Sequence, residues 1–380
     1  MSSAKIKKGF RLGRGFITDI SWLDCGDKIK TVICVKRPTF NAQLFVDGRA
    51  YTDAINDEEP FDRKSHVFYI EKSSVNENTE LVITFNAIRP HGPKCSFTFT
   101  YGKPVFADEA ELLKQYDSGL TETSRESEAL ADGVAYSHIL YKDKNGAPVH
   151  AFLAEVDTSL AFLYIGTPDD GYESRNVRAT IPDMIDCAVK NGRDVIAAVN
   201  ADFFDMFGDF HPSGLCVKNG KVVANENSTR PFIGVKKDGT HVLTDTKESA
   251  GIVAGLEQAA AGIQMVLKDG DIFDYAPLEP FSFVRHPRTC AGVKKDGNVL
   301  ILVVDGRIPE YSNGASLVDL ALLMKSYGAD RAVNLDGGGS SAIYTKNGSE
   351  YKLRSRPADL IRPTACLIRK DYNSLLVVKK

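Results

Sequence analysis

Residues 331–344 bring a carboxylate, three glycines and two hydroxyls together in the run RAVNLDGGGSSAIY. Asp336 ends an apolar segment, where its carboxylate can serve as an acid, a base or a nucleophile. The residues that follow it are Gly337, Gly338, Gly339, Ser340 and Ser341. Glycines reach φ values that other residues avoid, so their backbone N–H groups can converge on an anion, with the serine hydroxyls as further donors. We therefore predict a turn that binds a phosphate, the alternative being a tight turn whose glycines only permit close packing.

Three further segments place polar residues after apolar runs: AAVNADFFD, FVRHPRTCAGV and ILVVDGRIPEYSNG. Their candidate side chains are Asn200, Asp202, Asp205, His286, Arg288, Thr289, Asp305, Arg307, Glu310 and Ser312. Taken singly, each has a structural alternative: a turn residue for Asp305, a structural histidine for His286, surface charges for the arginines. Active sites gather such groups from the ends of strands, so their joint occurrence favours one site.

This set of groups suits one kind of reaction. Paired carboxylates cleave glycosidic bonds, because one assists the leaving group and the other supports an oxocarbenium-like centre as nucleophile or base. Arginines and glycine-rich turns bind phosphates. A substrate that contains both a sugar and a phosphodiester would use all of them. The glycine run lacks the GK[ST] of a Walker loop and does not match a dinucleotide fingerprint.

Two helices are predicted to position these groups. One spans residues 181–192, IPDMIDCAVKNG, with apolar residues at helical spacing, and the apolar run RDVIAAVN follows it. The other spans residues 316–328, SLVDLALLMKSYG, where Ser316 and Asp319 form a start that resembles a capping box. Each helix thus precedes a buried strand that ends in a polar cluster.

The N-terminal part has a different pattern. Between residues 15 and 102, six short alternating runs rich in β-branched and aromatic residues are separated by turn formers, which is typical of a small β-sandwich. The acidic, Ser- and Thr-containing stretch that follows predicts a helix-containing linker. The expected fold class is mixed α+β, with a β-sandwich over 1–105, the linker over 106–133, and a mixed α/β catalytic domain over 134–380 with long strands and a few helices.

Length and composition agree with a soluble two-domain chain. The chain has 380 residues, whereas single cores stop growing near roughly 250 to 300 residues. Its 47 basic and 50 acidic residues nearly cancel, so no overall field would attract nucleic acid or an anionic membrane. No apolar run approaches the roughly 20 residues that a membrane-spanning helix needs.

The cysteines indicate a reducing compartment. Seven cysteines are widely scattered, without a C-x-x-C pair or a histidine at zinc spacing, so a disulfide framework is not expected. The start MSSAKIKKGF also lacks the apolar region of a secretory signal. A cytoplasmic location is therefore favoured on the residues alone.

Several of these segments carry a resemblance. VNADFFD, HPRTCAGV, the run from ILVVDGR to NLDGGGSSAIY, and the later SRPADLIRPTACLI resemble, in that order, the phosphodiester glycosidase family over roughly residues 134–370. The resemblance implies hydrolysis of a sugar 1-phosphodiester, such as one of α-N-acetylglucosamine, at the anomeric C–O bond. It also permits a secreted or cell-surface location.

The resemblance assigns roles to residues of this sequence. The catalytic candidates are Asp336, Asp305 and His286. The candidate substrate-binding residues are Asn200, Asp202, Arg288, Thr289, Arg307, Ser312, Asn334, Gly337, Gly338, Gly339, Ser340, Ser341 and Arg356. In this mechanism Arg288 and Arg307, with the glycine turn, hold the phosphate. Asp336 and Asp305 stabilise the oxocarbenium centre and activate water.

Two other functions are compatible with the residues. A metal-dependent phosphoesterase would use Asp202, Asp205 and His286 as ligands and would cleave the P–O bond. A non-catalytic module would bind a glycan phosphate without turnover. For the glycosidase we expect no cofactor, and a divalent cation near Asp202 and Asp205 belongs to the phosphoesterase alternative. The position of Asp202 is often small or uncharged in the family, which argues against a catalytic role there. The expected partner is a sugar-phosphodiester-containing glycan or glycopolymer, with no nucleic acid and no membrane span.

Overall fold

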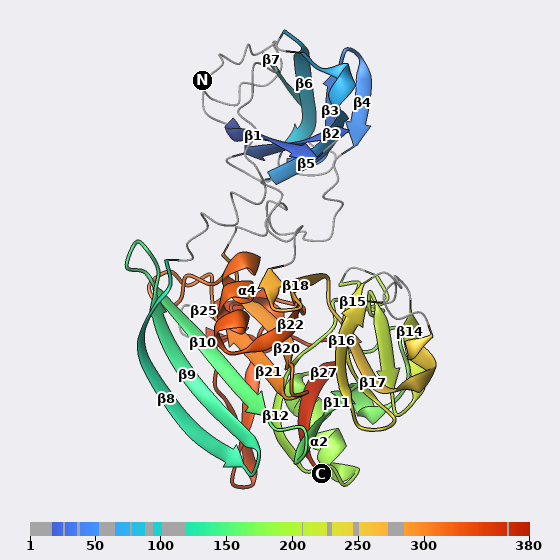
Figure 1. Ribbon diagram of the computed structural model, residues 1–380, viewed down its shortest axis with the longest axis vertical. Helices are drawn as coiled ribbons and strands as arrows, with labels where there is room; N and C mark the ends of the chain where they lie inside the picture. The colour runs from blue at the N-terminus through green and yellow to red at the C-terminus, as the bar shows by residue number, and fades with distance from the viewer. Residues whose placement is uncertain are drawn as a thin grey trace. The chain divides into compact units, whose positions relative to one another are not determined.

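The structure is a computed structural model that describes residues 17–25, 27–35, 39–52, 65–76, 78–87, 94–100, 119–206, 208–225, 230–245, 251–272, 285–362 and 365–380 (Figure 1). The chain divides into two compact units. The first comprises Met1–Tyr116 with Leu278–Phe281, and the second comprises Asp117–Pro277 with Ser282–Lys380.

The first unit contains two antiparallel sheets. Its strands are β1 (Ile17–Cys25), β2 (Lys28–Val35), β3 (Thr39–Val46), β4 (Arg49–Thr52), β5 (Ser65–Glu71), β6 (Glu80–Ala87) and β7 (Lys94–Thr100). The sheet orders are β1-β2-β5 and β4-β3-β6-β7. Buried side chains of both sheets, such as Ile33, Ile70, Leu44 and Ile83, belong to one apolar cluster. Each of the six predicted runs is confirmed to contain a strand, whereas a β-sandwich stays a prediction.

The second unit contains most of the described strands. They are β8 (Thr121–Ala131), β9 (Val134–Lys142), β10 (Pro148–Val156), β11 (Ala161–Gly166), β12 (Val195–Asn200), β13 (Leu215–Lys218), β14 (Lys221–Asn225), β15 (Pro231–Lys236), β16 (His241–Asp245), β17 (Leu256–Ala261), β18 (Gln264–Lys268), β19 (Asp271–Ile272), β20 (Arg288–Lys294), β21 (Val299–Val304), β22 (Ala329–Asn334), β23 (Ile343–Asn347), β24 (Glu350–Leu353), β25 (Leu360–Arg362), β26 (Ala365–Cys366) and β27 (Ser374–Lys379). The large sheet has the order β19-β18-β22-β20-β21-β10-β9-β8. Two five-stranded sheets have the orders β11-β27-β12-β23-β24 and β14-β13-β17-β15-β16.

The fold is mostly β, which corrects the expectation of a mixed α+β class. The described residues contain two α-helices, α2 (Ile181–Lys190) and α4 (Leu317–Ser326), and neither is long and apolar enough to cross a membrane. Every strand pair in the described residues is antiparallel. The repeated order of helix, strand and polar cluster suggested an α/β arrangement, but the strands that follow the helices pair with antiparallel neighbours instead.

Strand β8 overturns part of the predicted linker. Residues 121–131 form a long edge strand that pairs with β9 along its whole length. Nearly all of its side chains are exposed, so its composition is acidic and hydroxylated like that of a linker. Residues 121–131 form a strand because they pair with β9, which their composition alone does not indicate.

Both predicted helices are confirmed, and both begin with a capping box. In α2 the Thr180 hydroxyl accepts from the N–H of Asp183, whose carboxylate accepts from the N–H of Thr180. In α4 Ser316 and Asp319 exchange the same pair of hydrogen bonds. These boxes satisfy helix N–H groups that have no partner within the helix, and so they fix where each helix begins.

One hydrophobic core joins the three main sheets of the second unit. It includes Phe152 and Val303 from the large sheet, Val199 and Leu375 from the sheet of β12, and Ile233 from the third sheet. Figure 1 shows β12, β27 and β11 lying between the large sheet and the sheet of β15 to β17. The shared core therefore holds the ends of β12, β21 and β22 in fixed relative positions.

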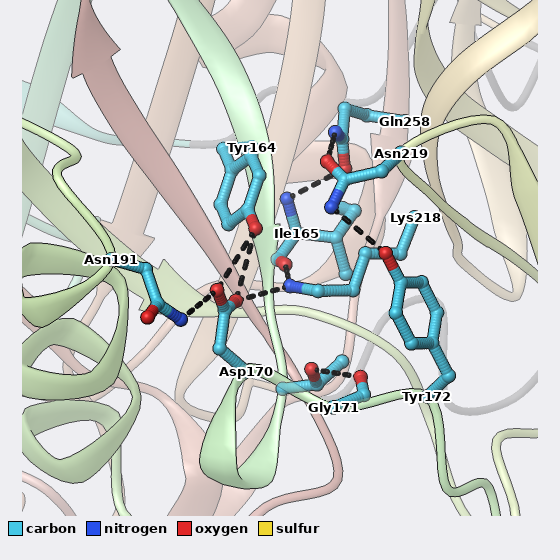
Figure 2. Close-up of polar contacts among 10 residues, drawn as sticks. Tyr164, Ile165, Asp170, Gly171, Tyr172, Asn191, Lys218, Asn219 and Gln258 are labelled. Atoms are coloured by element: carbon cyan, nitrogen blue, oxygen red, sulfur yellow. Dashed lines mark hydrogen bonds and ion pairs between the residues drawn. The ribbon is translucent and has the colours of Figure 1, made fainter.

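A buried ion pair anchors the turn after β11 (Figure 2). The Lys218 ammonium lies 2.5 Å from Oδ1 of Asp170 and donates to the carbonyl of Ile165 at 2.5 Å, with its side chain 0% exposed. The Tyr164 hydroxyl and the Asn191 amide also donate to Asp170, at 3.0 and 2.7 Å. Because β11 and β12 flank β27 and end at the same side of that sheet, this turn lies beside the end of β12.

Removing the charge of Asp170 should destabilise the second unit. Asp170→Asn keeps a residue type that tolerates the φ of +53° at this position but leaves the Lys218 ammonium buried without a counter-charge. We expect a loss of about 3–5 kcal/mol in the free energy of unfolding, measured by urea denaturation. Lys218→Met should recover most of this loss in the double variant.

The matched control is Asp169→Asn. Asp169 is exposed and has nearly the same backbone conformation, with a φ of +54°. Its substitution should change the stability by less than about 0.5 kcal/mol. Equal effects of the two single substitutions would show that backbone conformation, not the buried charge, decides the stability here.

Candidate active site

The site forms where β20 runs between β21 and β22. Both pairs are antiparallel, with Arg288 opposite Val304 of β21 and Cys290 opposite the last residue of β22. The first residues of β20 therefore lie beside the last residues of its two neighbours. This register places Asp305 and Asp336, each just after its strand, at one end of the large sheet, as the sequence predicted.

Asn200, the last residue of β12, ties this end of the large sheet to the neighbouring sheet. Its side chain is fully buried, and its Nδ2 donates to the backbone carbonyl of Asp336 at 2.6 Å. Its Oδ1 accepts from the Thr289 hydroxyl at 2.7 Å and from the N–H of Ala342 at 3.3 Å. The Thr289 hydroxyl also lies 3.4 Å from that of Ser341. Asn200, Thr289 and Ser341 thus fix the loop that carries Asp336, and their role in binding substrate stays a prediction.

The glycine loop differs from the predicted anion-binding turn. The N–H of Gly337 donates to Oδ1 of Asp336 at 2.8 Å, and the N–H of Gly338 donates to the carbonyl of Pro287 at 2.9 Å. The N–H groups of the two serines donate to the carbonyls of the first two glycines, at 3.2 and 3.4 Å. These amides are committed to protein acceptors, so they do not converge on an anion.

Close packing accounts for the glycines. Gly338 has a φ of +63°, and a Cβ there would lie 2.9 Å from the Arg307 guanidinium. A Cβ at Gly339 would overlap the side chains of Asp359 and Arg369. The geometry thus supports the alternative stated from the sequence, with glycines that let charged side chains approach the backbone.

Asp305 is a buried carboxyl with an unusual pKa. Its Oδ2 accepts from the Tyr311 hydroxyl at 3.1 Å and from the N–H of Arg356 at 2.7 Å. Its Oδ1 has no hydrogen-bond partner within the described part of the chain. Burial raises the pKa of Asp305 to about 7, although both donors favour the ionised form. A carboxyl in this state can exchange a proton near neutral pH.

The loop after β21 holds Asp305 in place. The Ser312 hydroxyl donates to the carbonyl of Asp305 at 2.5 Å and accepts from the N–H of His150 at 3.0 Å. The Tyr311 ring stacks on the His150 ring with centroids 4.0 Å apart, and the Arg356 guanidinium lies 5.2 Å from the Tyr311 centroid. Ser312 is buried, so it positions Asp305 and does not offer its side chain to a substrate.

Two further buried carboxyls are close enough to Asp336 to feel its charge. Burial raises the pKa of Asp202 to about 8, and the charge of Asp336 adds to this shift. Burial also raises the pKa of Asp371 well above its ordinary value, again with a contribution from Asp336. Burial thus favours the protonated form of both carboxyls, which lessens the negative charge beside Asp336. Asp336 is 9% exposed, whereas Asp202 and Asp371 are 1% and 2% exposed.

Asp202 should make stability fall with pH. Its pKa is about 8 in the fold against an ordinary 3.8, so between about pH 4 and 8 the unfolded chain releases a proton that the folded chain keeps. Stability contributed by this group therefore decreases as pH rises through that window, by up to about 1.4 kcal/mol per pH unit. Asp202→Asn cannot titrate, so its advantage in stability over the parent should be larger at pH 8.5 than at pH 5 in urea unfolding.

The control for this prediction is Asp186→Asn on the exposed face of α2. It should leave the difference between pH 5 and pH 8.5 unchanged. A parent-like pH dependence of the Asp202→Asn variant would show that Asp202 is ionised throughout this range.

The two predicted arginines differ in accessibility. Arg288 is 2% exposed, and its Nε donates to the carbonyl of Ala315 at 3.3 Å. Arg307 is exposed, and its Nε donates to Nδ1 of His286 at 3.4 Å. Arg307 also has a φ of +62°, a conformation that costs energy for a residue other than glycine and recurs at functional sites. Arg307 is therefore the arginine that an incoming anion can reach, with His286 as its hydrogen-bond partner, and Arg288 supports the site from within the protein.

The remaining candidates have structural surroundings. Asn334 is buried within the large sheet, between β18 and β20. Asp205 forms a local turn, with its Oδ1 accepting from the N–H of Gly208 at 2.9 Å. Within the described ranges, no three His, Cys, Asp or Glu side chains are placed to share a metal ion. The predicted set of Asp202, Asp205 and His286 is thus not assembled.

Four residues of the site were not predicted. Arg369 pairs with Asp359 at 2.7 Å, and its Nη1 donates to the Ser340 hydroxyl at 3.3 Å. Asn373 donates to Oδ2 of Asp202 at 2.8 Å and accepts from its N–H at 2.9 Å. Asp371 is the buried carboxyl described above. Asp371 and Asn373 stand just before β27 in the run RKDYNSLLVV, so a search for polar residues before strands, as well as after them, would have found them.

Part of this chain is similar in sequence to known proteins. Residues 193–377 match the family model described as phosphodiester glycosidase. The chain is 27% identical over 202 residues to mouse N-acetylglucosamine-1-phosphodiester alpha-N-acetylglucosaminidase, covering 48% of this chain and 36% of that protein. It is 45% identical over 187 residues to the SPbeta prophage-derived uncharacterized protein YomE of Bacillus subtilis strain 168, covering 46% of this chain and 27% of that protein. The chain thus spans about a third of the length of these relatives.

A solved structure shares the fold. The auto-inhibited catalytic domain of the zebrafish N-acetylglucosamine-1-phosphodiester alpha-N-acetylglucosaminidase superposes with a TM-score of 0.55 at 21% identity. The superposition covers 68% of this chain and 89% of that one. Asn200, Arg288, Asp305 and Asp336 all lie inside the matched range of the family model. Residues 193–377 of this chain thus match the phosphodiester glycosidase family.

Proposed function

We propose that this chain hydrolyses a sugar 1-phosphodiester, such as one of α-N-acetylglucosamine, at the anomeric C–O bond. Water adds its oxygen to the anomeric carbon, the C–O bond breaks, and its electron pair leaves with the phosphate oxygen. The products are the free sugar and a phosphomonoester. The observation that carries the proposal is a buried carboxyl with a pKa near 7, Asp305, at the same end of the sheet as Asp336 in a glycosidase-family domain.

The two carboxyls have different roles in this mechanism. Asp336 is the more accessible, at 9% exposed against 1% for Asp305, and supports the oxocarbenium-like centre or the attacking water. Asp305 in its protonated form donates to the departing phosphate oxygen. This revises the role expected from the sequence, where Asp305 activated water. The revision follows from burial, which keeps the proton on Asp305 up to about pH 7.

The cationic groups bind the diester phosphate. Arg307 offers an exposed guanidinium beside the glycine loop, where it approaches Gly338, and the half-buried His286 ring accepts a hydrogen bond from it. A guanidinium can hold two phosphate oxygens at once and stabilise the negative charge that develops on them. Arg288 contributes a second, buried positive charge behind the loop.

Hydrolysis in oxygen-18 water tests the proposal. Cleavage of the anomeric C–O bond places the label in the released sugar, and we expect all of it there. Label in the phosphate would identify the metal-dependent phosphoesterase instead, and loss of turnover in EDTA would support that result. Tight binding of a sugar phosphate without any release of sugar would identify a binding module.

A further inference from the structure

A cavity of about 410 Å³ lies between the edge strand β8, strand β9 and strand β24. Among the lining residues that can form hydrogen bonds are Glu126, Glu128, Tyr136, His138, Lys352 and Arg354. Its volume falls in the range of small-molecule sites, which is roughly 300–1,000 Å³. Strands β8 and β9, which supply most of the lining, precede the range that matches the family model.

The lining carries balanced charge. Two carboxylates face one ammonium and one guanidinium, and the guanidinium is already engaged. Arg354 lies 2.6 Å from Glu128, donates from Nε to the Thr345 hydroxyl at 2.6 Å, and lies 4.9 Å from the centroid of the Tyr136 ring. A phosphate would find no net positive charge here to bind it. A hydroxyl both donates and accepts, so a neutral polyhydroxylated ligand suits the lining better.

The cavity connects to Asp305 through a series of direct contacts. The His138 Nε2 lies 2.9 Å from the His150 Nδ1, and the His150 ring stacks on Tyr311, whose hydroxyl donates to Asp305. The charge of Asp305 is also close enough to contribute to the raised pKa of Tyr136, which burial chiefly causes.

The backbone makes a second connection. Arg354 lines the cavity, and two residues further along the chain the N–H of Arg356 donates to Asp305. Two residues of chain span at most about 7 Å, which is close to the length of one sugar ring with its linkage. Along the backbone, a lining residue of the cavity therefore lies within about one sugar unit of the residue that donates to Asp305.

We infer that this cavity is a subsite for a second, neutral sugar unit of the substrate. The inference rests on the proposed function and extends it, because the substrate then contains at least two sugars. The second sugar is attached either to the sugar that is released or to the phosphate as its alcohol. Glu126 accepts hydrogen bonds from its hydroxyls, and Lys352 donates to them.

The test compares three phosphodiesters with the full chain. The first is the methyl diester of α-N-acetylglucosamine 1-phosphate. In the second a hexose replaces the methyl group, and in the third the N-acetylglucosamine carries one further hexose. We expect kcat/KM of at least one extended substrate to exceed that of the methyl diester by about tenfold or more, and the substrate that gains identifies the side of attachment.

Substitution of Glu126 tests whether the cavity causes the preference for the extended substrate. Glu126→Gln should reduce the preference to less than threefold while kcat/KM for the methyl diester changes by less than twofold. The matched control is Glu122→Gln, on the same exposed edge strand but paired with Arg125 away from the cavity, and it should keep the full preference. Equal rates for short and extended substrates, or an equal loss on both, would overturn the inference.

A binding experiment tests this inference independently of the proposed function. If no phosphodiester is hydrolysed, the proposed function fails, and titration of the full chain with a neutral disaccharide then decides about the cavity. Shifts of the His138 ring signals that weaken at least fivefold in Glu126→Gln would support the subsite. The absence of any shift at millimolar disaccharide would overturn it.

Discussion

Replacing Asp336 by asparagine should lower kcat for sugar release by roughly a thousandfold or more, because an essential carboxylate in a preorganised site is worth several kcal/mol. Asparagine has nearly the same shape, and its side-chain oxygen can still accept the hydrogen bond from Gly337. The hydrogen bond from Asn200 goes to the backbone of residue 336 and is unaffected. The loss should therefore appear in kcat while the unfolding midpoint in urea stays close to that of the parent.

The matched control is Asp330→Asn, on the same strand but near its other end. Asp330 is partly exposed and lies 3.9 Å from the Lys295 ammonium. Its substitution should change kcat by less than twofold. An Asp336→Asn protein that keeps more than a tenth of the parent kcat would remove Asp336 from the reaction and leave Asp305 as the sole acidic candidate.

Elements with strong local signals were predictable from the sequence. Ser316 and Asp319 form the capping box that their spacing predicted, and the six N-terminal runs each contain a strand. The placement of Asp305 and Asp336 was also predictable, because each follows a buried apolar run. Arg288 differs, because it begins its strand. These signals lie within a few residues of the feature that they specify.

Features that depend on distant partners were not predictable. Strand β8 exists through its pairing with β9, and its exposed residues carry no apolar alternation. The N–H of Gly338 is committed to Pro287, a residue about fifty positions away, so a glycine run alone could not distinguish an anion site from close packing. The same holds for the raised pKa of Asp202, which depends on the sheets that bury it.

The second large effect concerns Asp305 and its proton. If Asp305 donates to the departing phosphate oxygen, it must be protonated, which holds below its pKa of about 7. The parent kcat/KM should therefore be highest below about pH 7 and should fall about tenfold per unit above it. Asp305→Asn should abolish this fall and should lower the rate at pH 6 by roughly a hundredfold, the lower end of the range for general acids.

The leaving group provides an internal check on that role. A phenyl phosphodiester gives a less basic leaving phosphate than a methyl one, so it needs less help from an acid. Asp305→Asn should therefore impair hydrolysis of the methyl diester more than that of the phenyl diester. Equal impairment of both would indicate that Asp305 positions the substrate and transfers no proton.

Tyr311→Phe tests whether the proton on Asp305 sets the pH profile. The Tyr311 hydroxyl donates to Oδ2 of Asp305 and so favours its ionised form, although burial outweighs it. Without that donor the pKa of Asp305 should rise, and the fall in kcat/KM should move to higher pH while the rate at pH 6 stays within about threefold. A structural role of Tyr311 alone would lower the rate at every pH and leave the midpoint of the fall unchanged. If Asp305 acted as a base, kcat/KM would instead rise with pH through the pKa of Asp305, and that rise would move to higher pH in Tyr311→Phe. Whether the falling or the rising part of the pH profile moves therefore separates the two chemical roles that a buried carboxyl with a neutral pKa can have.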